Sequence, residues 1–490
     1  MGRTIVVIGG GPAAVEAAVA AGQAGASVTL VSDGPIGGRA GWDSLVPSKV
    51  WLAAADLLGE LRAAEALGLT ALPPVHVAPQ AVLARIRAVA QSWSDQALQR
   101  LSAAGVTRIS GVASFSGPRS LTVSAEGQPP TTLAADAIII ATGSVPRFPP
   151  GLRPDGKRVL APRFASSLDT LPPDIIVVGG GATGCEFTSL FTRLGVPVTW
   201  LVGDPRVLPQ FAPAAGAHLA QALVDAGVTL HTAAMVERIE PEQAGVAVVT
   251  SDGARYRAAM AFLAIGRSPD LARLNLEATG LPTNPDGTLT VDSYGQSGVP
   301  GIYAVGDAAG APMLANRAMA QAWIAGRHAA GLTVEPYRPE AIIHAVYSDP
   351  EVAQLGSLEG LPNTLQRIRV PYTAGLKGHL IPNPVGSSAL SLPLSLIVTP
   401  CAAICNPKSA IGNGISPGAG AGWIELSYEP ASGQIRGALA VGAHAADVLA
   451  PVALAVQLGA GLAHLAPVFA AHPALSELAF IAARAALERG

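Results

Sequence analysis

The sequence is poor in charge, since only 13% of its 490 residues are Asp, Glu, Lys or Arg. The 31 basic and 34 acidic residues leave a formal net charge of -3 at pH 7. A balance so close to zero provides no electrostatic reason to bind nucleic acid or an anionic membrane surface. We therefore exclude both classes of partner. Half of the residues are hydrophobic, which predicts a globular chain with more than one core.

Cysteine is also scarce, because the chain has only Cys185, Cys401 and Cys405. Three cysteines cannot build a disulfide framework, and no signal-like segment precedes the first apolar run. We therefore expect a cytoplasmic protein, and we expect no metal site. The spacing of Cys401 and Cys405 has little specificity as a redox centre away from a strand-to-helix turn. Cys185 is expected to be a small buried residue.

No charged residue occurs in the 30 positions between Lys377 and Lys408. This stretch has three interpretations: a membrane span, an insertion near residues 380–421, or a frame-shifted coding segment. Pro393 and Pro400 shorten the longest apolar run below the roughly 18 residues that a span requires. We therefore expect an insertion on the surface and no stable insertion into a membrane.

The chain contains two copies of one module. Shifting the sequence by 170 residues aligns Gly9 with Gly179 and, in the same register, Glu16 with Glu186. In each copy an apolar run stops at a glycine cluster and a segment of helical composition follows, which predicts strand, turn and helix. A second apolar run then completes a βαβ unit with a parallel, buried sheet. The pattern predicts an α/β fold with two Rossmann-like domains.

Both copies have the glycine spacing of a dinucleotide-binding turn. The residues that set this spacing are Gly9, Gly11 and Ala14 in the first copy and Gly179, Gly181 and Gly184 in the second. Such a turn lets backbone amides approach a pyrophosphate at the N-terminus of a helix, where the helix dipole favours an anion. We therefore predict two nucleotide sites.

The two copies differ where an acid normally binds the ribose hydroxyls, at the end of the second strand. The equivalent positions are Ser32 and Val202. In the first copy Asp33 follows directly and can serve. In the second copy Asp204 and Arg206 are close, but neither stands at the expected position. The choice between NADH and NADPH therefore stays open.

Four further segments follow in a characteristic order. They are Ala141-Thr142-Gly143, GIYAVGD at 301–307, SDPEVAQLG at 348–356 and HPALSE at 472–477. Together with the two modules, this order resembles the flavoprotein disulfide reductases, the family of dihydrolipoamide dehydrogenase, mercuric reductase and glutathione reductase. The resemblance covers almost the whole chain apart from the insertion.

The resemblance implies three domains. They are an FAD-binding domain at 1–149 and 280–338, an NAD(P)H-binding domain at 150–279, and a C-terminal α+β dimerisation domain at 339–490. It also implies a homodimer, FAD as cofactor, and NADH or NADPH as electron donor.

The resemblance further assigns cofactor contacts outside the glycine turns. Asp307 would hold the ribityl and phosphate region of FAD, and Ala113 would meet the adenine through its backbone. Thr142 and Gly143, with Gly266 as their counterpart in the second module, end the strands that border the two cofactors.

The redox-active dithiol of the family is missing. Family members have CxxxxC shortly before Pro-Ser-Lys, and counting back from Lys49 puts Ala40 and Leu45 at the two positions. A dithiol relay needs one thiolate that attacks and a second thiol that closes the disulfide. We therefore do not expect a disulfide reductase that works by the usual route.

Four catalytic candidates remain. Lys49 matches the family lysine beside the flavin N5, which pairs with the residue matching Glu186. His472 and Glu477 match an acid–base histidine and the carboxylate that orients it, delivered from the partner subunit. The alternatives are a solvated Lys49 and Glu186, and a structural His472.

The family geometry leaves a pocket lined by Ala40, Trp42 and Leu45 where the dithiol would be. A quinone suits such a pocket because it is flat and apolar and needs a proton, which the partner's His472 could supply. We therefore hypothesise an FAD-dependent NAD(P)H oxidoreductase with a quinone acceptor. A soluble nicotinamide transhydrogenase and a catalytically degenerate redox-sensing or scaffold flavoprotein are the alternatives.

Overall fold

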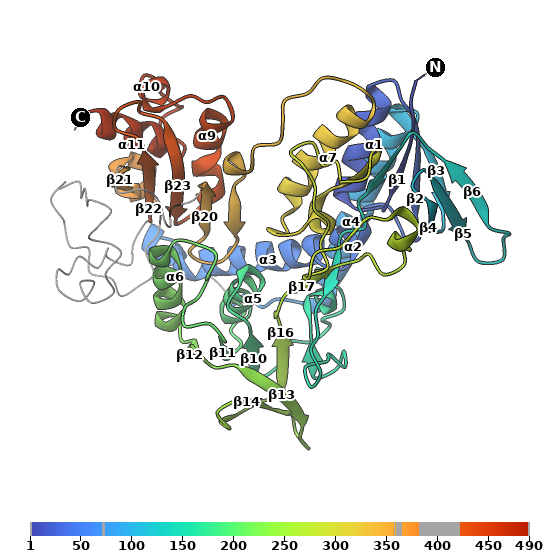
Figure 1. Ribbon diagram of the computed structural model, residues 1–490. Coiled ribbons are helices and arrows are strands. Elements are labelled where there is room, and N and C mark those ends of the chain that lie inside the picture. Colours follow the sequence, from blue (N-terminus) through green and yellow to red (C-terminus); the bar gives the residue numbers. More distant parts are fainter. Residues whose placement is uncertain (1, 71–73, 357, 359–364, 382–421, 489–490) are drawn as a thin grey trace.

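The computed structural model describes residues 2–70, 74–356, 358, 365–381 and 422–488. Three five-stranded sheets each form the centre of one body of the molecule, and helix α3 (Leu45–Ala63) runs between these bodies (Figure 1). The predicted mixed α/β fold is confirmed. Cys401, Cys405 and nearly all of the predicted insertion lie outside the described residues.

The first sheet is parallel and has the order β18-β7-β1-β2-β3. Its strands are β1 (Thr4–Ile8), β2 (Ser27–Ser32), β3 (Thr107–Ser110), β7 (Ala137–Ile140) and β18 (Ile302–Ala304). One face is covered by helices α1 (Pro12–Gln23) and α7 (Ala315–Ala329), and the other by the antiparallel strands β4 (Val112–Gly117), β5 (Ser120–Ser124) and β6 (Thr131–Ala134).

The apolar run of β1 is explained by this double covering. Ile5 and Val7 belong to the core under the helices, whereas Val6 and Ile8 belong to the core under β4 and β5. Successive side chains of a strand point to opposite faces, so a strand buried on both faces must be continuously hydrophobic.

The second sheet repeats this arrangement in the order β12-β11-β10-β16-β9, also parallel. Its strands are β9 (Val159–Leu160), β10 (Ile175–Val178), β11 (Val198–Leu201), β12 (Thr229–His231) and β16 (Met260–Leu263). Helices α5 (Ala182–Arg193) and α6 (Pro213–Asp225) lie on one side, and the antiparallel strands β13 (Val236–Pro241), β14 (Val246–Thr250) and β15 (Arg255–Ala258) lie on the other.

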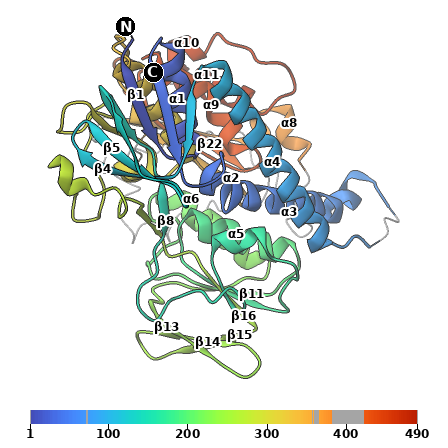
Figure 2. The ribbon, with the colours of Figure 1, turned by 90° about the vertical axis from the view of Figure 1, so that its right-hand side faces the viewer.

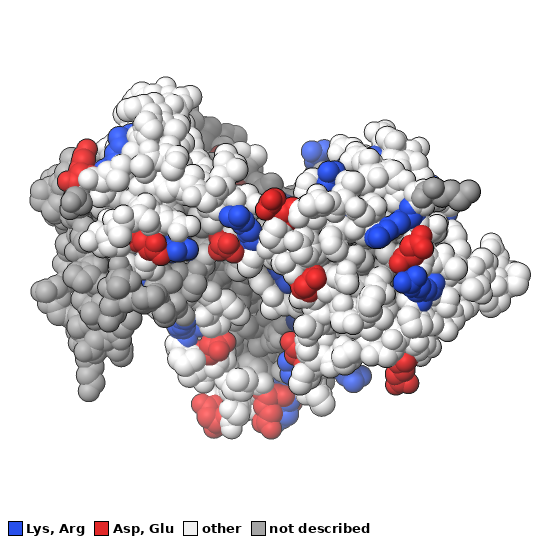
Figure 3. Space-filling view, turned by 45° about the horizontal axis from the view of Figure 1, so that its top comes forward, with Lys and Arg blue, Asp and Glu red and all other residues white. Residues whose placement is uncertain are grey.

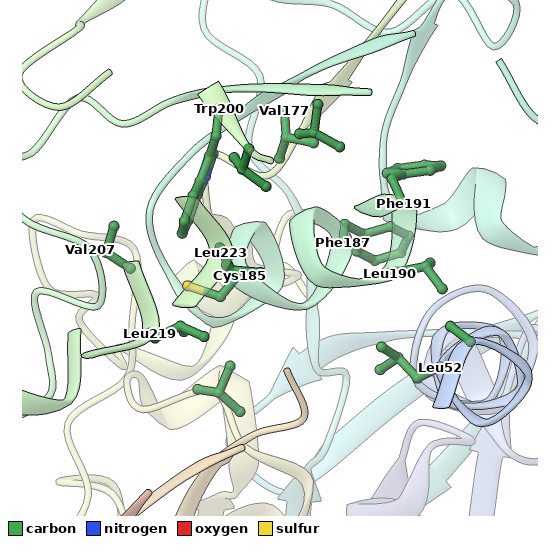
Figure 4. Packing of buried hydrophobic residues seen from close by; sticks show 14 of the residues in the cluster. Leu52, Val177, Cys185, Phe187, Leu190, Phe191, Trp200, Val207, Leu219 and Leu223 are labelled. Atoms are coloured by element: carbon green, nitrogen blue, oxygen red, sulfur yellow. The ribbon is translucent and has the colours of Figure 1, made fainter. Parts of the chain in front are cut away.

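Cys185 lies on α5 inside the core of this second body, near Leu219 and Leu223 (Figure 4). It is fully buried, and this burial raises the pKa of its thiol well above the usual range. The expectation of a small buried residue is confirmed, and Cys185 has no exposed thiolate for redox chemistry.

The third sheet is antiparallel, in the order β19-β20-β23-β22-β21. Its strands are β19 (His344–Val346), β20 (Val352–Gly356), β21 (Gln366–Pro371), β22 (Trp423–Tyr428) and β23 (Ile435–Val441). Helices α9 (Ala445–Gln457) and α11 (Glu477–Leu487) share its core. Two short helices, α8 (Leu376–His379) and α10 (Leu462–Leu465), complete this body.

Helix α3 and the long helix α4 (Pro79–Ala103) pack together and project beside the first body (Figure 2). Trp51 and Leu52 of α3 share one core cluster with Phe187 of α5, so this helix links the first two bodies. The short strands β8 (Ser144–Pro146) and β17 (Arg267–Pro269) form a second link between them. The remaining short elements are α2 (Gly38–Trp42) and the 3-10 turns Ala64–Leu67, Pro162–Ser166, Leu276–Thr279, Gly306–Ala309, Pro339–Ala341 and Tyr372–Ala374.

In the face seen in Figure 3, charged side chains are scattered and do not gather into a patch of one sign. Within the part of the chain that the structure describes, no helix has the length and hydropathy that a membrane span requires. The expected cytoplasmic location and the exact domain boundaries stay predictions.

Gly184 shows how closely a helix and a strand approach each other in the second module. A Cβ added there would lie 1.9 Å from the carbonyl oxygen of Gly179. We expect Gly184→Ala to displace α5 from β10 and to destabilise the protein by more than ~2 kcal/mol. The urea midpoint of unfolding measures this. Gly298→Ala is the matched control, because a Cβ there meets no atom within 4 Å; equal midpoints for the two variants would contradict the prediction.

Candidate functional site

A cleft of about 2820 Å³ lies where the carboxyl ends of β1 and β10 open toward each other. In open α/β sheets, ligands bind in the crevice outside these strand ends. Twelve of the predicted site residues line the cleft: Gly9, Gly11, Asp33, Lys49, Ala113, Thr142, Gly143, Gly179, Gly181, Glu186, Gly266 and Asp307. The structure thus brings together both glycine turns and the Lys49–Glu186 pair.

The first glycine turn leaves room for an anion at the N-terminus of α1. A Cβ added to Gly11 would meet no atom within 4 Å, so this backbone faces the open cleft. Position 9 requires glycine for two reasons. Its φ is +132°, and a Cβ added there would lie 2.3 Å from the carbonyl oxygen of Ala141. Ala14 is fully buried and packs the helix against the turn. Gly9 and Ala14 therefore determine the shape of the turn, and Gly11 leaves the backbone of the turn open to the cleft.

Asp33 lines the cleft and forms an ion pair with Arg273 at 2.6 Å. The Ser32 hydroxyl, at the position where an acid is usual, donates to the carbonyl of Gly34 at 3.1 Å and so stabilises its own loop. Of Ser32 and Asp33, only Asp33 has the carboxylate that can bind the ribose hydroxyls.

The second glycine turn repeats this geometry, because Gly181 again faces open space. Val202 is fully buried and packs over Gly180, where an added Cβ would lie 2.4 Å from its Cγ1. The guanidinium of Arg206 donates to the carbonyls of Pro209 and Phe211 at 2.8 and 2.9 Å. Neither Val202 nor Arg206 lines the cleft, whereas Asp204 does.

Asp307 is part of a polar network at the centre of the cleft. It accepts a hydrogen bond of 2.5 Å from the hydroxyl of Ser144, which in turn accepts one of 2.7 Å from Arg267. Burial lowers the pKa of Arg267, an effect that the negative charge of Asp307 opposes. The motifs did not single out Ser144 or Arg267. Their positions in the sequence could have indicated them, because Ser144 and Arg267 each directly follow a glycine after an apolar strand.

Arg39 lies one position before Ala40 and reaches across the cleft. Its guanidinium donates to the carbonyl of Thr142 at 2.6 Å and pairs with Asp270 at 2.8 Å. The Thr142 hydroxyl is buried and has no hydrogen-bond partner among the described residues. An unsatisfied buried hydroxyl is costly, and one beside a cleft fits a polar atom of a bound ligand.

The predicted pairing of Lys49 with Glu186 is confirmed. The ammonium of Lys49 donates to both carboxylate oxygens at 2.8 Å, although the two residues are 137 positions apart. The side chains are 30% and 12% exposed, so the alternative of two solvated surface charges is wrong. Tyr347 supports the pair through its backbone N–H, 3.1 Å from Glu186, and through its ring, 4.3 Å from the ammonium.

His472 and Glu477 lie outside the cleft of their own chain. The Nδ1 atom of His472 is 2.9 Å from the carboxylate of Glu477, and the ring is 62% exposed. Burial acts to raise the pKa of Glu477, but hydrogen bonds from the Ala474 N–H and His472 outweigh it, so the pKa is lowered. The carboxylate therefore stays charged and orients the imidazole. A role in the partner's cleft stays a prediction.

Ala40, Trp42 and Leu45 line the cleft together with one face of α4. The α4 residues are Ala81, Val82, Arg85, Ala88, Val89, Ser92, Trp93 and Gln96. Their spacing of three and four is that of a helix face, so sequence periodicity could have identified them. Trp93 packs against Gly41, the residue before Trp42, because a Cβ added to Gly41 would be 3.2 Å from the Trp93 ring.

Glu351 lies in the segment that follows Tyr347. Burial raises its pKa to about 7, and the negative charges of Asp56 and Asp447 act in the same direction. The backbone N–H of Ala445, at the start of α9, partly offsets this effect. Glu351 is thus a carboxyl group that the fold keeps partly protonated near neutral pH.

The sequence profile of the pyridine nucleotide-disulphide oxidoreductases matches residues 3–322, and that of their dimerisation domain matches residues 402–482. An NAD(P)H dehydrogenase (quinone) of Mycobacterium tuberculosis is 32% identical over 96% of this chain and 91% of its own. A dihydrolipoyl dehydrogenase of Halobacterium salinarum is 30% identical over 99% of this chain and 96% of its own.

The crystal structure of LpdA from Mycobacterium tuberculosis superposes with a TM-score of 0.85 at 30% identity, covering 99% of both chains. The HOCl-induced flavoprotein disulfide reductase RclA of Escherichia coli shares the fold, with a TM-score of 0.77 at 21% identity over 99% of both chains.

The raised pKa of Glu351 makes stability depend on pH. The folded chain keeps a proton on Glu351 where the unfolded chain has lost it, so this group lowers stability as the pH rises from 4.5 to about 7. We expect Glu351→Gln to remove this loss and to raise stability above pH 7 by at most ~3 kcal/mol, with little change at pH 4. Urea unfolding at both pH values measures the difference. The exposed Glu126→Gln is the control, and a gain by Glu351→Gln that does not depend on pH would disprove the assignment.

Proposed function

Because the chain belongs to the pyridine nucleotide-disulphide oxidoreductase family, whose members depend on FAD and NAD(P)H, we propose that it oxidises NAD(P)H and reduces a quinone. The observation that carries the proposal is the wall of the cleft. Ala40 and Leu45 stand at the two dithiol positions, while the Lys49–Glu186 pair is retained. Electrons must then leave the flavin without a disulfide as intermediate carrier.

The first half of the cleft fits FAD. The open backbone at Gly11 suits the pyrophosphate, the carboxylate of Asp33 suits the adenosine ribose, and the unsatisfied Thr142 hydroxyl and the carboxylate of Asp307 offer further polar contacts. When bound, FAD supplies a carrier that accepts a hydride from NAD(P)H and delivers two electrons to an acceptor.

The chain provides the donor side through the second glycine turn and the ion pair. Gly181 leaves its backbone open to the pyrophosphate of NAD(P)H. Glu186 holds the Lys49 ammonium by two hydrogen bonds, and Tyr347 fixes Glu186 in turn. A charge that is paired in this way can lie in a low-dielectric cleft without moving when substrate binds.

The acceptor side is the surface of Ala40, Trp42 and Leu45 with the facing residues of α4. Aromatic side chains such as Trp42 and Trp93 offer flat apolar faces on which a quinone ring can stack. The quinone takes up two electrons and two protons to become a hydroquinone. NAD(P)H contributes a hydride, so one further proton must come from the protein or from solvent.

We assign that proton to the partner subunit's His472 in a homodimer, which the dimerisation domain supports. Within one chain, Glu477 accepts the hydrogen bond from Nδ1 of His472. This contact leaves Nε2 as the atom that can donate a proton. The name of the relative from Mycobacterium tuberculosis, NAD(P)H dehydrogenase (quinone), agrees with this choice of acceptor. The lipoyl acceptor in the names of other relatives is disfavoured by the missing thiols.

Anaerobic half-reactions test the proposal. We expect NADH or NADPH to bleach the flavin absorbance of the purified protein, and menadione to restore it. Oxidised lipoamide should leave it bleached, because no thiol stands at position 40 or 45. A colourless protein would indicate a scaffold. Rapid hydride exchange with a thio-NADP analogue, without response to menadione, would indicate a transhydrogenase.

The proton transfer gives a second prediction. We expect His472→Ala to slow reoxidation by menadione about a hundredfold, a typical size for loss of a general acid. Reoxidation by ferricyanide, which accepts electrons without protons, should be unchanged. Stopped-flow measurements with both acceptors provide the comparison, and His379→Ala, an exposed histidine in the same body, is the control. Equal slowing with both acceptors would remove the proton role.

A further inference from the structure

The adenosine end of the second nucleotide site can be located from the order of the strands. Strand β11 lies on one side of β10 and β16 on the other. In a doubly wound sheet the pyrophosphate lies over the first strand and the adenosine over the second. The adenosine half therefore lies over the ends of β11 and β12, where Gly203, Asp204 and residues 234–237 line the cleft.

The residue at the end of β11 cannot bind a ribose, because Val202 is apolar and 0% exposed. Gly203 has no side chain, and the end of Met235 would lie only 3.1 Å from a Cβ added there. Asp204 comes next, is exposed and lines the cleft. Its backbone carbonyl accepts a hydrogen bond of 2.9 Å from the N–H of Ala233, which ties the loop after β11 to the loop after β12. This contact fixes the backbone of Asp204 at the adenosine end.

A 2'-phosphate would need a cation at this end. Arg206 is committed to its own loop through the carbonyls of Pro209 and Phe211. Arg238 pairs with Glu237 at 3.2 Å and with Glu240 at 2.8 Å. Neither arginine lines the cleft, whereas the acidic Asp204 and Glu237 both do.

The lysine and arginine residues that do line the cleft belong to other elements: Arg39, Lys49 and Arg85 on α2, α3 and α4, Arg147 and Arg267 in or beside β8 and β17, and Arg273 in the ion pair with Asp33. Strand β17 follows β16, on the opposite side of β10 from β11. Arg267 therefore lies away from the adenosine ribose of the second site, while Lys49 is paired with Glu186 and Arg273 with Asp33.

We propose that the cleft selects NADH over NADPH, and that Asp204 is the acid that binds the 2'- and 3'-hydroxyls of the adenosine ribose. Hydroxyl groups donate charge-assisted hydrogen bonds to a carboxylate. A 2'-phosphate would instead place a charge of about -2 near two carboxylates, and juxtaposition of like charges is unfavourable. The inference depends on the proposed oxidation of NAD(P)H.

Two measurements test it on the purified holoprotein. The first is kcat/KM with NADH and with NADPH, with menadione as acceptor. The second is the Kd of NAD⁺ and NADP⁺ by isothermal titration calorimetry, which does not depend on turnover. We expect NADH and NAD⁺ to be preferred by about tenfold or more at low ionic strength, with a smaller ratio at high salt.

Asp204→Asn should raise the KM for NADH and the Kd for NAD⁺ about tenfold and leave kcat unchanged. It should also reduce the preference for NADH over NADPH and for NAD⁺ over NADP⁺. Asp225→Asn is the matched control, since Asp225 ends α6 just before β12 begins, at the other end of the sheet. Equal or tighter binding of NADP⁺, or an unchanged preference in Asp204→Asn, would overturn the inference. Absence of flavin reduction by either nucleotide would defeat the proposed function instead, and the calorimetric preference would still decide the role of Asp204.

Discussion

The close approach of each glycine turn to the end of a neighbouring strand is the constraint on which the rest of this structure depends. In each module a backbone carbonyl lies where a side chain at the first glycine would have to be, Ala141 in the first copy and Ala264 in the second. Only glycine permits that approach. The same packing turns the N-termini of α1 and α5 toward one shared cleft, so both nucleotide sites follow from it.

The repeated module also places a glutamate at the same position in both copies, but the two glutamates have different partners. Glu16 on α1 pairs with Arg100 of α4 at 2.7 Å, and this contact joins two helices of one body. Glu186 on α5 pairs with Lys49 of α3, so the equivalent contact joins two bodies and lies in the cleft. The same register thus provides a carboxylate in each module, and in the second module this carboxylate lies where the two bodies meet.

Much of this arrangement could be predicted from the sequence, because it depends on local pattern. Apolar runs that end at glycines predicted the two parallel sheets, and the resemblance to the family implied that Lys49 pairs with Glu186. The contacts of Arg39, Ser144 and Arg267 could not be predicted, since each joins residues more than a hundred positions apart in the sequence. Arg206 illustrates the same limit, because proximity in sequence did not reveal that its guanidinium is bound by carbonyls of its own loop.

Ala40 and Leu45, at the positions that match the family dithiol, carry no sulfur, and this affects the chemical durability of the cleft. Thiolates are the groups that peroxide, hypochlorous acid and alkylating agents attack first. Among the described residues no cysteine lines the cleft, and Cys185 is fully buried with a raised thiol pKa. Among the described residues, the cleft therefore presents no thiol to such reagents, and the sulfur atoms that line it are the thioethers of Met235 and Met313. A catalyst built on this cleft would not be inactivated through oxidation of a dithiol, the route by which an enzyme dependent on a dithiol is lost.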